Sequence, residues 1–416
     1  MAADDVAPAR RVAFTVLRRI SSEGAYADRA LRGDAKRLNP RDYGLAKRMV
    51  FGTVQRRGTL DWVINDRVDR ELDAPVRDAL RLGIYQLLYL DGVADHAAVG
   101  ESVALARAAS GKGAGGLVNA VLRRVQRDDI VLPSDDGPAG AAIRHSHPAW
   151  LVERWWKDLG PEATRALLIA NNEPAELALR VNTLVEHDLS DIEGDRLGDA
   201  IVVRGGLDPA THPGFAAGAF IVQSRAAQAV SRIVDPQPGE RVLDLCAAPG
   251  GKTTHLAALM GGTGEIVAVE RHEGRARMLQ EACARLKATN VRVVVGDAST
   301  FTDPEGFDRV LLDPPCSGLG TLRTHPDLRW RVRPEDVETL AGIQDRLLQT
   351  ARGALREDGP GRLVYATCTI SKREERMVGD GRLRTLPSRD GTDGFYIAWH
   401  GDGRTDRPRP GVPELP

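Results

Sequence analysis

LDLCAAPGGKTTHLA, which runs from Leu243 to Ala257, joins a short apolar run to a turn of small residues and then to the start of a helix. Glycine and alanine in such a turn let backbone amides approach a ligand closely at a helix N-terminus. The stretch therefore predicts a strand–turn–helix unit of an α/β fold, with a ligand site at the turn.

The end of this stretch, GGKTT, raises the question of a P-loop, whose pattern is Gly-x-x-x-x-Gly-Lys-Ser/Thr. The first glycine of that pattern lets the backbone curl around phosphates. Counting back from Gly251 places Cys246 at this position. The sequence therefore excludes a P-loop, and the turn needs another ligand.

Four more apolar runs follow LDLC toward the C-terminus. The five runs are ERVLDLC, GEIVAVE, VRVVVGD, FDRVLLD and GRLVYAT, and a long helix is expected from Pro334 to Glu357 before the last of them. Strands alternating with helical segments are typical of an open, doubly wound α/β sheet, whose ligands bind beyond the carboxyl ends of the strands. We expect this Rossmann-like domain over residues 223–416.

The rest of the 416-residue chain predicts two further regions. Apolar residues recur at three- and four-residue spacing from Ala9 to about Arg127, which indicates an all-α bundle over residues 1–128. Residues 129–142 are rich in Asp, Gly and Pro, as in a linker. Residues 143–222 mix helices with short strands such as ELALRVNTL, as in a small α+β region; the glycines and prolines of GDRLGDAIVVRGGLDPATHPGF leave its middle undefined.

Composition is that of a soluble protein in a reducing compartment. The chain has 42% hydrophobic and 28% charged residues and no long apolar run. Its acidic N-terminus differs from a signal peptide. The four cysteines form no Cys-x-x-Cys pair, which argues against a zinc site or a disulfide framework. We expect a cytoplasmic monomer without a metal or a membrane segment.

Positive charge is concentrated near the N-terminus. Residues 1–60 contain 13 Arg or Lys and 6 Asp or Glu, a balance of +7, although the whole chain carries −1. Such a region either contacts nucleic-acid phosphates or consists of solvated helix faces.

Each predicted strand of the sheet ends at a residue whose side chain can react or bind a ligand. These strand-end residues are Cys246, Glu270, Asp297, Asp313 with the nearby Cys316, and Thr367 with Cys368. Glu270 follows Gly251 by 19 residues, the spacing at which nucleotide-binding folds place an acid against ribose hydroxyls. Asp297 is placed to contact an adenine amino group.

One acid at a strand end is more often a helix cap, and one buried cysteine is more often a core residue. Cys283 has no further context and is interpreted as core. The strand-end residues differ because all of them share one edge of the predicted sheet, which makes a common site the better interpretation.

A nucleoside cofactor without a phosphate loop, beside two cysteines, indicates S-adenosylmethionine and a reaction that needs a thiol. Carbon 5 of cytosine is a poor nucleophile, and a thiolate bonded temporarily to carbon 6 activates it. A second group must then remove the proton from carbon 5 so that the thiol can depart.

Long motifs resemble one family, the bacterial small-subunit ribosomal RNA (cytosine-5) methyltransferases of the RsmB or Sun type. The segments that carry the resemblance are VQSRAAQAVSRIVDPQPGERVLDLCAAPGGKTTHLA, LLDPPCSGLGTLRTHPDLRW, LVYATCTI and DGTDGFYIAWH. LRVNTL and HSHPAWLVERW are similar to the small RNA-binding region of that family, and GLVNAVLRRV to its NusB-type RNA-binding domain.

The resemblance implies a role for each matching residue. Cys368 is the implied nucleophile, Cys316 assists product release, and Asp313 contacts the cytosine edge as charge develops there. Lys252 holds the loop or the methionine end of the cofactor, unless it is only a solvent-facing lysine. The implied cofactor contacts are Cys246, Ala247, Ala248, Pro249, Gly250, Gly251, Lys252, Glu270, Asp297 and Asp313.

Some positions depart from the family pattern. Ser224 and Arg225 stand where acidic residues are usual, Arg376 replaces an asparagine, and the segment between Cys368 and Gly394 is short. We expect methylation of carbon 5 of a cytosine in RNA, most simply ribosomal RNA. The alternatives are an enzyme that acts on transfer RNA or on a protein, and an inactive RNA-binding protein.

Overall fold

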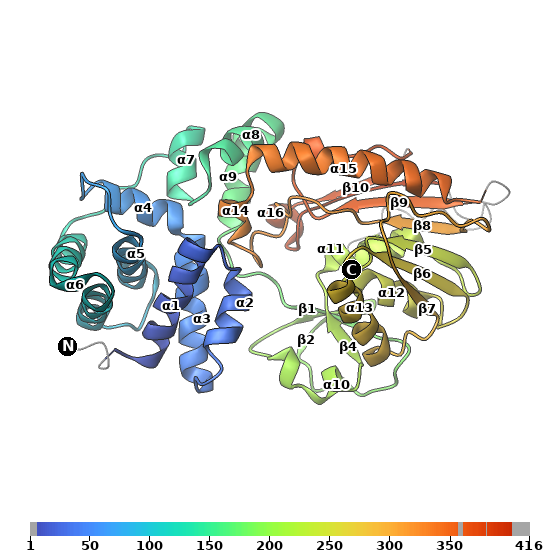
Figure 1. The fold of residues 1–416 in the computed structure, drawn as a ribbon, viewed down its shortest axis with the longest axis horizontal. Helices are drawn as coiled ribbons and strands as arrows, with labels where there is room; N and C mark the ends of the chain where they lie inside the picture. Colours follow the sequence, from blue (N-terminus) through green and yellow to red (C-terminus); the bar gives the residue numbers. More distant parts are fainter. Residues whose placement is uncertain (1–5, 357–360, 380, 402–416) are drawn as a thin grey trace. The chain divides into compact units, whose positions relative to one another are not determined.

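The computed structural model of the protein describes residues 6–356, 361–379 and 381–401, which form two compact units. The helical unit contains residues 6–172 and the short segment 325–331, and the α/β unit contains the other described residues. Each unit is described separately below (Figure 1).

The helical unit is built from short amphipathic helices. They are α1 (Pro8–Glu23), α2 (Ala27–Asp34), α3 (Pro40–Gln55), α4 (Arg57–Asn65), α5 (Ala74–Tyr89), α6 (Asp95–Arg127), α7 (Pro138–Arg144), α8 (Ala149–Leu159) and α9 (Pro161–Ala170). Proline in the first turn of several of them suits a position whose N–H has no helical partner. Apolar side chains from α1 to α6 form one continuous core, as the three- and four-residue spacing predicts.

The segment 325–331, which follows the Pro-Cys motif in the chain, belongs to the helical unit and contains α14 (Leu328–Arg331). The Arg329 guanidinium is fully buried and donates to the carbonyls of Ser146 and Asn171 at 3.0 and 3.1 Å. The indole of Trp330 donates to the Val54 carbonyl at 2.7 Å. The helical unit is therefore complete only with this distant segment of the chain.

The α/β unit begins with a small antiparallel sheet of order β2-β3-β1-β4. Its elements are β1 (Ala178–Val181), β2 (Gly194–Leu197), β3 (Ala200–Val203), the 3-10 helix η2 (Pro209–Thr211), α10 (Pro213–Ala216) and β4 (Phe220–Val222). A two-residue turn joins β2 to β3, and Gly198 takes its first position with φ of +64°. Strands β2 and β3 therefore form a hairpin. It lies in the region where the many glycines and prolines prevent a prediction of strands from the sequence.

The second sheet has seven strands in the order β10-β11-β9-β8-β5-β6-β7. Strands β5 to β9 are parallel to one another, whereas β11 is antiparallel to β9 and β10 to β11. The strands are β5 (Arg241–Leu245), β6 (Glu265–Glu270), β7 (Val291–Val295), β8 (Arg309–Leu312), β9 (Arg362–Thr367), β10 (Gly381–Thr385) and β11 (Phe395–His400). The five predicted strands are therefore confirmed, and β10 adds an edge strand that the sequence does not predict.

Helices cover both faces of this sheet (Figure 1). One face carries α11 (Arg225–Val234), α12 (Gly251–Leu259) and α13 (Glu273–Arg285), and the other carries α15 (Pro334–Gly353). Successive residues of β5 point to opposite faces of the sheet. Val242 packs in the core with the first set of helices, and Leu243 packs in the core with α15. The short elements η3 (Lys372–Glu374) and α16 (Pro387–Asp390) lie between β9 and β11 in the chain.

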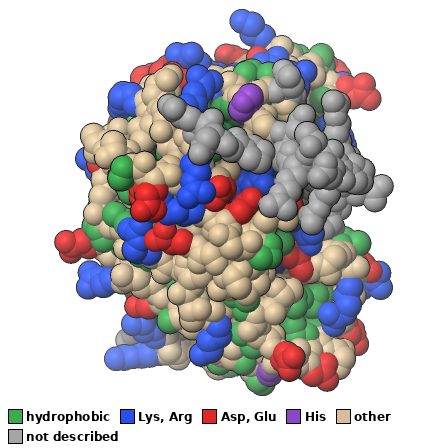
Figure 2. Space-filling model, turned by 90° about the vertical axis from the view of Figure 1, so that its right-hand side faces the viewer, with side chains coloured by type: hydrophobic (Ala, Val, Ile, Leu, Met, Phe, Trp, Pro, Cys, Tyr) green, Lys and Arg blue, Asp and Glu red, His purple; other side chains and the backbone are tan. Residues whose placement is uncertain are grey.

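Ion pairs tie the amino-terminal edge of the sheet together. Arg241 pairs with Glu265 at 2.8 Å and with Asp303 at 2.9 Å, and Arg309 pairs with Glu240 at 3.0 Å. Figure 2 shows basic and acidic side chains intermixed on the face that it views. These contacts fix the edge of the sheet that lies opposite the carboxyl ends of the parallel strands.

Two predicted boundaries differ from the structure. The helix predicted from Pro334 to Glu357 ends at Gly353, because Leu355 then forms a β-bridge with Phe307; Glu357 itself lies outside the described residues. Helix α7 begins at Pro138, inside the predicted linker, because a proline at a first helical position starts a short helix there.

Candidate active site

The carboxyl ends of the parallel strands bring the predicted residues to one edge of the sheet. Leu245 of β5 pairs in register with Val269 of β6 on one side and with Leu312 of β8 on the other. The chain runs from β5 outward to β7 and then returns to β8 and β9, so the order reverses between β5 and β8. Ligands of doubly wound sheets bind at this reversal point.

The loop after β5 has a backbone that only small residues suit. Cys246 adopts a left-handed φ of 65°, and Gly250 has a φ of 102°. A Cβ atom on Gly250 would lie 2.7 Å from the side chain of Leu279. The turn of alanines and glycines therefore delivers the N-terminus of α12 to the carboxyl edge of the sheet.

Asp244, a buried acid of β5, links this strand to the helix that follows the loop. Asp244 is fully buried and accepts a hydrogen bond from the Thr253 hydroxyl at 2.6 Å, which links β5 to α12. Burial, with a further contribution from the charge of Asp313, raises the pKa of Asp244 to about 7. The group therefore gains a proton near neutral pH.

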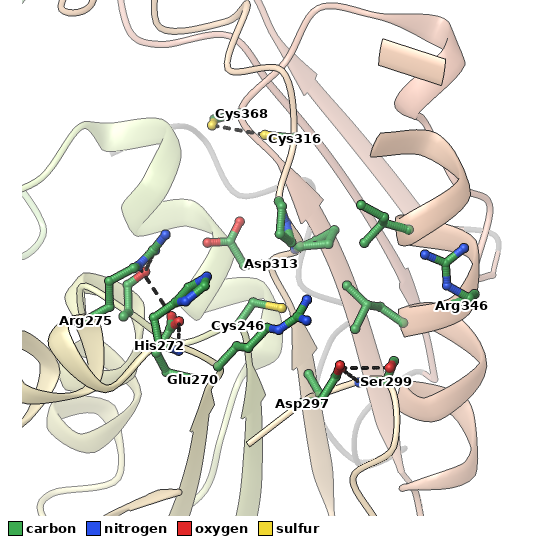
Figure 3. Close-up of a pocket in the computed structure, with 17 residues that line it drawn as sticks. Cys246, Glu270, His272, Arg275, Asp297, Ser299, Asp313, Cys316, Arg346 and Cys368 are labelled. Atoms are coloured by element: carbon green, nitrogen blue, oxygen red, sulfur yellow. Dashed lines mark hydrogen bonds and ion pairs between the residues drawn. The ribbon is translucent and has the colours of Figure 1, made fainter. Parts of the chain in front are cut away.

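A pocket of about 440 Å³ lies at this edge (Figure 3). The predicted residues that line it are Cys246, Ala248, Glu270, Asp297, Asp313, Cys316 and Cys368. Five others do not line it, namely Ala247, Pro249, Gly250, Gly251 and Lys252. The loop thus contributes Cys246 and Ala248 to the wall, while its glycines shape the turn.

Glu270 and Asp297 lie together at one end of the pocket, away from the thiols (Figure 3). Glu270 is 5% exposed and accepts the His272 amide at 2.9 Å. Arg275 approaches the Glu270 carboxylate at 3.4 Å and donates to the Ala248 carbonyl at 2.5 Å. This end therefore presents carboxylate oxygens to the hydroxyl and amino donors of a ligand.

Ser299 supports Asp297 through two hydrogen bonds. Its hydroxyl donates to the Asp297 carboxylate at 2.7 Å and its amide at 2.9 Å, and these bonds lower the pKa of Asp297. The sequence does not assign Ser299 to the site, nor the other lining residues Arg271, His272, Arg275, Ala298, Pro314, Pro315, Ile343, Arg346 and Leu347. Most of them have no motif of their own, because they follow a strand end or lie on α13 or α15.

The other end of the pocket holds the two thiols. The sulfur atoms of Cys316 and Cys368 are 3.4 Å apart (Figure 3). The hydrogen bond with Cys368, together with burial, raises the pKa of Cys316 well above that of a free thiol. Cys316 therefore keeps its proton at neutral pH.

Lys252 does not line the pocket itself but forms an ion pair with Asp313, which does. Its ammonium lies 2.6 Å from the Asp313 carboxylate and 5.4 Å from the centre of the Phe395 ring. Burial alone would lower the pKa of Lys252, but the charge and hydrogen bond of Asp313 outweigh it and raise the pKa. Lys252 is thus a charged partner of Asp313, with its side chain only 15% exposed.

The remaining two cysteines lie apart from this pair of thiols. Burial raises the pKa of Cys246 to about 12 and that of Cys283 to about 11. Cys283 is a buried residue of α13, and Cys246 lies in the pocket wall. Cys316 and Cys368 are the two cysteines of the site whose sulfur atoms are in contact.

Proteins of known class are similar to this one over nearly the whole chain. A protein of Synechocystis sp. named "Probable ribosomal RNA small subunit methyltransferase B" is 36% identical, covering 94% of this chain and 98% of its own length. "Ribosomal RNA small subunit methyltransferase B" of Vibrio cholerae is 33% identical, with 94% and 96% coverage. This chain belongs to that family. The resemblance carried by the sequence motifs is thereby confirmed.

Family descriptions of single regions agree with membership of the methyltransferase B family. "16S rRNA methyltransferase RsmB/F" matches residues 231–385, "NusB family" matches residues 7–127, and "Methyltr_RsmF/B-like, ferredoxin-like domain" matches residues 147–188. The predicted fold class is confirmed, with a helical N-terminal region and a Rossmann-like C-terminal domain. As a member of this family, the chain is an S-adenosylmethionine-dependent methyltransferase.

A solved structure shares the whole architecture of this methyltransferase. The crystal structure of PH0851 matches with a TM-score of 0.78 and 26% identity, and it covers 95% of this chain and 99% of that chain. Among the described residues, no helix is long and apolar enough to cross a membrane, and no group of three or more His, Cys, Asp or Glu residues could hold a metal ion.

The positions at which this methyltransferase departs from the family pattern have structural partners. Arg225 pairs with Glu176 at 2.8 Å, and Arg376 pairs with Asp345 of α15 at 2.5 Å. Ser224 precedes α11 at its N-cap position. The ion pairs of Arg225 and Arg376 thus join segments of the α/β unit, and none of the three residues lines the pocket.

Proposed function

We propose that this enzyme methylates carbon 5 of a cytosine in small-subunit ribosomal RNA, in the cytoplasm, with Cys368 as the nucleophile and Cys316 as the residue that assists release. The observation that carries the proposal is the pair of thiols 3.4 Å apart at one end of a pocket whose other end carries Glu270 and Asp297. The names of the relatives favour ribosomal RNA over transfer RNA or a protein as the substrate.

The pocket residues fit S-adenosylmethionine. A volume of about 440 Å³ lies within the range of small-molecule sites. Glu270 would accept from ribose hydroxyls, Asp297 would accept from the adenine amino group, and the loop from Cys246 to Lys252 would hold the methionine end. When bound, the cofactor supplies an electrophilic methyl group to carbon 5 of the base.

Cys368 would begin the reaction by losing its thiol proton to solvent and forming a bond from its sulfur to carbon 6 of the cytosine. The electron pair of the double bond between carbons 5 and 6 then becomes available at carbon 5. Asp313 would accept a hydrogen bond from the exocyclic amino group of the base, and the ammonium of Lys252, 2.6 Å away, would hold that carboxylate in place.

Release of the product requires two proton movements that Cys316 could link. The bond from carbon 6 to Cys368 breaks, and the departing sulfur takes the proton of Cys316, its neighbour at 3.4 Å. The resulting Cys316 thiolate takes the proton of carbon 5. The electrons of that carbon–hydrogen bond restore the aromatic ring.

The helical unit is assigned to RNA binding. Its NusB-family match and the charge of +7 over residues 1–60 support contacts to phosphates. The α/β unit contains all the residues assigned to chemistry, so binding and catalysis are divided between the two units.

Bisulfite sequencing of small-subunit ribosomal RNA tests this function directly, because 5-methylcytosine resists conversion. RNA from cells with the gene should retain a cytosine that is converted in cells without it, and complementation with the Cys368→Ser variant should leave that cytosine convertible. Identical patterns with and without the gene would contradict the proposal.

A further inference from the structure

The carboxylate of Glu374 lies between the two loops that carry the thiols. Glu374 ends η3 and is fully buried. It accepts the Ser317 amide at 2.8 Å and the Ser317 hydroxyl at 2.5 Å, and it accepts the Thr369 hydroxyl at 3.1 Å. Ser317 directly follows Cys316, and Thr369 directly follows Cys368. One side chain thus binds the neighbours of both thiols.

Other contacts hold Glu374 itself in place. Gln344 of α15 donates to the Glu374 carboxylate at 3.2 Å and to the Pro315 carbonyl at 3.0 Å. The Tyr365 hydroxyl of β9 donates to the Glu374 backbone carbonyl at 2.7 Å. Glu374 is therefore held in place by a helix and a strand, so its carboxylate can hold the two loops in fixed positions.

The two loops also contact each other next to Glu374. The hydroxyls of Ser317 and Thr369 are 2.7 Å apart, and the Gly320 amide donates to the Cys368 carbonyl at 3.0 Å. Hydrogen bonds to a carboxylate are about twice as strong as those between neutral groups. The bonds of Glu374 are therefore the strongest side-chain links between the residues that follow the thiols.

We propose that Glu374 is a positioning residue that sets the distance between Cys316 and Cys368. It acts on the reaction only through the two thiols, and its effect on methylation rests on the function proposed above. The next residue, Glu375, provides a matched control, because it pairs with Arg384 at 2.5 and 3.0 Å and does not touch the loops of the thiols through that pair.

Three variants of the full-length chain separate the possibilities. Glu374→Leu removes all the bonds to the loops. Glu374→Gln removes the charge but keeps the contacts, because its carbonyl can accept from the Ser317 and Gln344 N–H groups while its amide donates to the Ser317 and Thr369 hydroxyls. Glu375→Leu tests the general effect of removing an acid from this segment.

The first measurement needs no RNA. Diamide, a two-electron thiol oxidant, should join Cys316 to Cys368 in the parent, and peptide mapping would give the rate of this disulfide. We expect the rate to fall about tenfold or more in Glu374→Leu, because the thiols are no longer held close together. Glu375→Leu should remain close to the parent, and Glu374→Gln, which keeps the contacts without the charge, should lie between the parent and Glu374→Leu.

The second measurement uses RNA that contains 5-fluorocytidine, whose fluorine blocks elimination and traps the covalent adduct. Adduct formation should slow by about 100-fold in Glu374→Leu, the cost of a misplacement of about 1 Å. Binding of S-adenosylmethionine should stay unchanged, because Glu374 does not line the pocket. A parent that forms no adduct would refute the proposed chemistry, and the disulfide rates would still decide the role of Glu374.

Parent-like disulfide and adduct rates in Glu374→Leu would overturn the inference. So would a Glu374→Gln variant as slow as Glu374→Leu, because the contacts would then not be the cause. If Glu374→Leu does not fold, Ser317→Ala decides the question, since it removes the shortest bond to the carboxylate. Unchanged rates in that variant would also overturn the inference.

Discussion

The sulfur of Cys316 lies 3.4 Å from the sulfur of Cys368, although 52 residues separate them in the chain. Strands β8 and β9 are parallel neighbours, so the loops that leave their carboxyl ends begin side by side. Two thiols at this distance can share a hydrogen bond, in which either sulfur is the donor. The pair is therefore the part of the site on which the proposed mechanism depends.

Loss of Glu270 should weaken binding of S-adenosylmethionine. Removal of a hydrogen bond to a charged group costs about 1.5–3 kcal/mol, so the Kd of Glu270→Ala should rise about 10- to 150-fold in titration calorimetry. Glu273→Ala is the control, because Glu273 is exposed in the first turn of α13 and does not line the pocket. Equal affinities of Glu270→Ala and the parent would exclude Glu270 as the ribose ligand.

Stability should depend on pH through Asp244. Its pKa is about 7 in the folded protein and about 3.9 in an unfolded chain, so the folded state binds more protons between these values. The free energy of unfolding should therefore fall as pH rises from about 4 to 7, and it should not vary with the protonation of this group below about pH 4.

Asp244→Asn should remove that dependence while keeping an acceptor for Thr253. In urea unfolding at a series of pH values, the variant should gain stability relative to the parent as pH rises from about 4 to 7. Parallel curves for the two proteins would show that Asp244 does not titrate in this range.

Affinity for RNA should fall steeply with salt and should depend on the basic residues of the helical unit. Arg48 is exposed on α3, and Arg48→Glu should weaken binding. The slope of log affinity against log salt should fall in that variant by about 0.7–0.9 for each phosphate that the protein no longer neutralises. Arg382→Glu, an exposed change on β10, should leave the slope unaltered.

Point variants suit this test better than removal of residues 1–128. The helical unit includes residues 325–331, and Trp330 donates to the Val54 carbonyl. Removal of the N-terminal helices would expose that segment of the chain as well. A slope that does not change in Arg48→Glu would mean that this residue binds no phosphate.

The sequence predicts the parts of this protein that depend on local pattern. Runs such as FDRVLLD and GRLVYAT identify the parallel strands, and their shared direction places Asp313 and Cys368 at one edge without further information. The structure supplies what no local pattern contains. Glu374 contacts the residues that follow both thiols, Ser317 and Thr369, because the fold brings η3 against the two loops. In the sequence, Glu374 is only one of two adjacent acidic residues.

Long-range packing accounts for the other features that the sequence does not reveal. The segment 325–331 lies within a motif of the α/β unit, yet Arg329 is buried in the helical unit. Strand β10 lacks an apolar alternation, because Arg382 and Arg384 occupy its pattern, and it forms by pairing with β11. Such elements depend on a partner that is distant in sequence.

The most direct test of the mechanism compares Cys316→Ser with Cys368→Ser on a cytosine-containing RNA substrate in denaturing gel electrophoresis. Cys316→Ser should attack and methylate once but release slowly, so it should accumulate an enzyme–RNA adduct that survives denaturation. Cys368→Ser should form no adduct and transfer essentially no methyl groups. An adduct in Cys368→Ser but not in Cys316→Ser would reverse the two roles, and full activity in both variants would contradict covalent catalysis by these thiols.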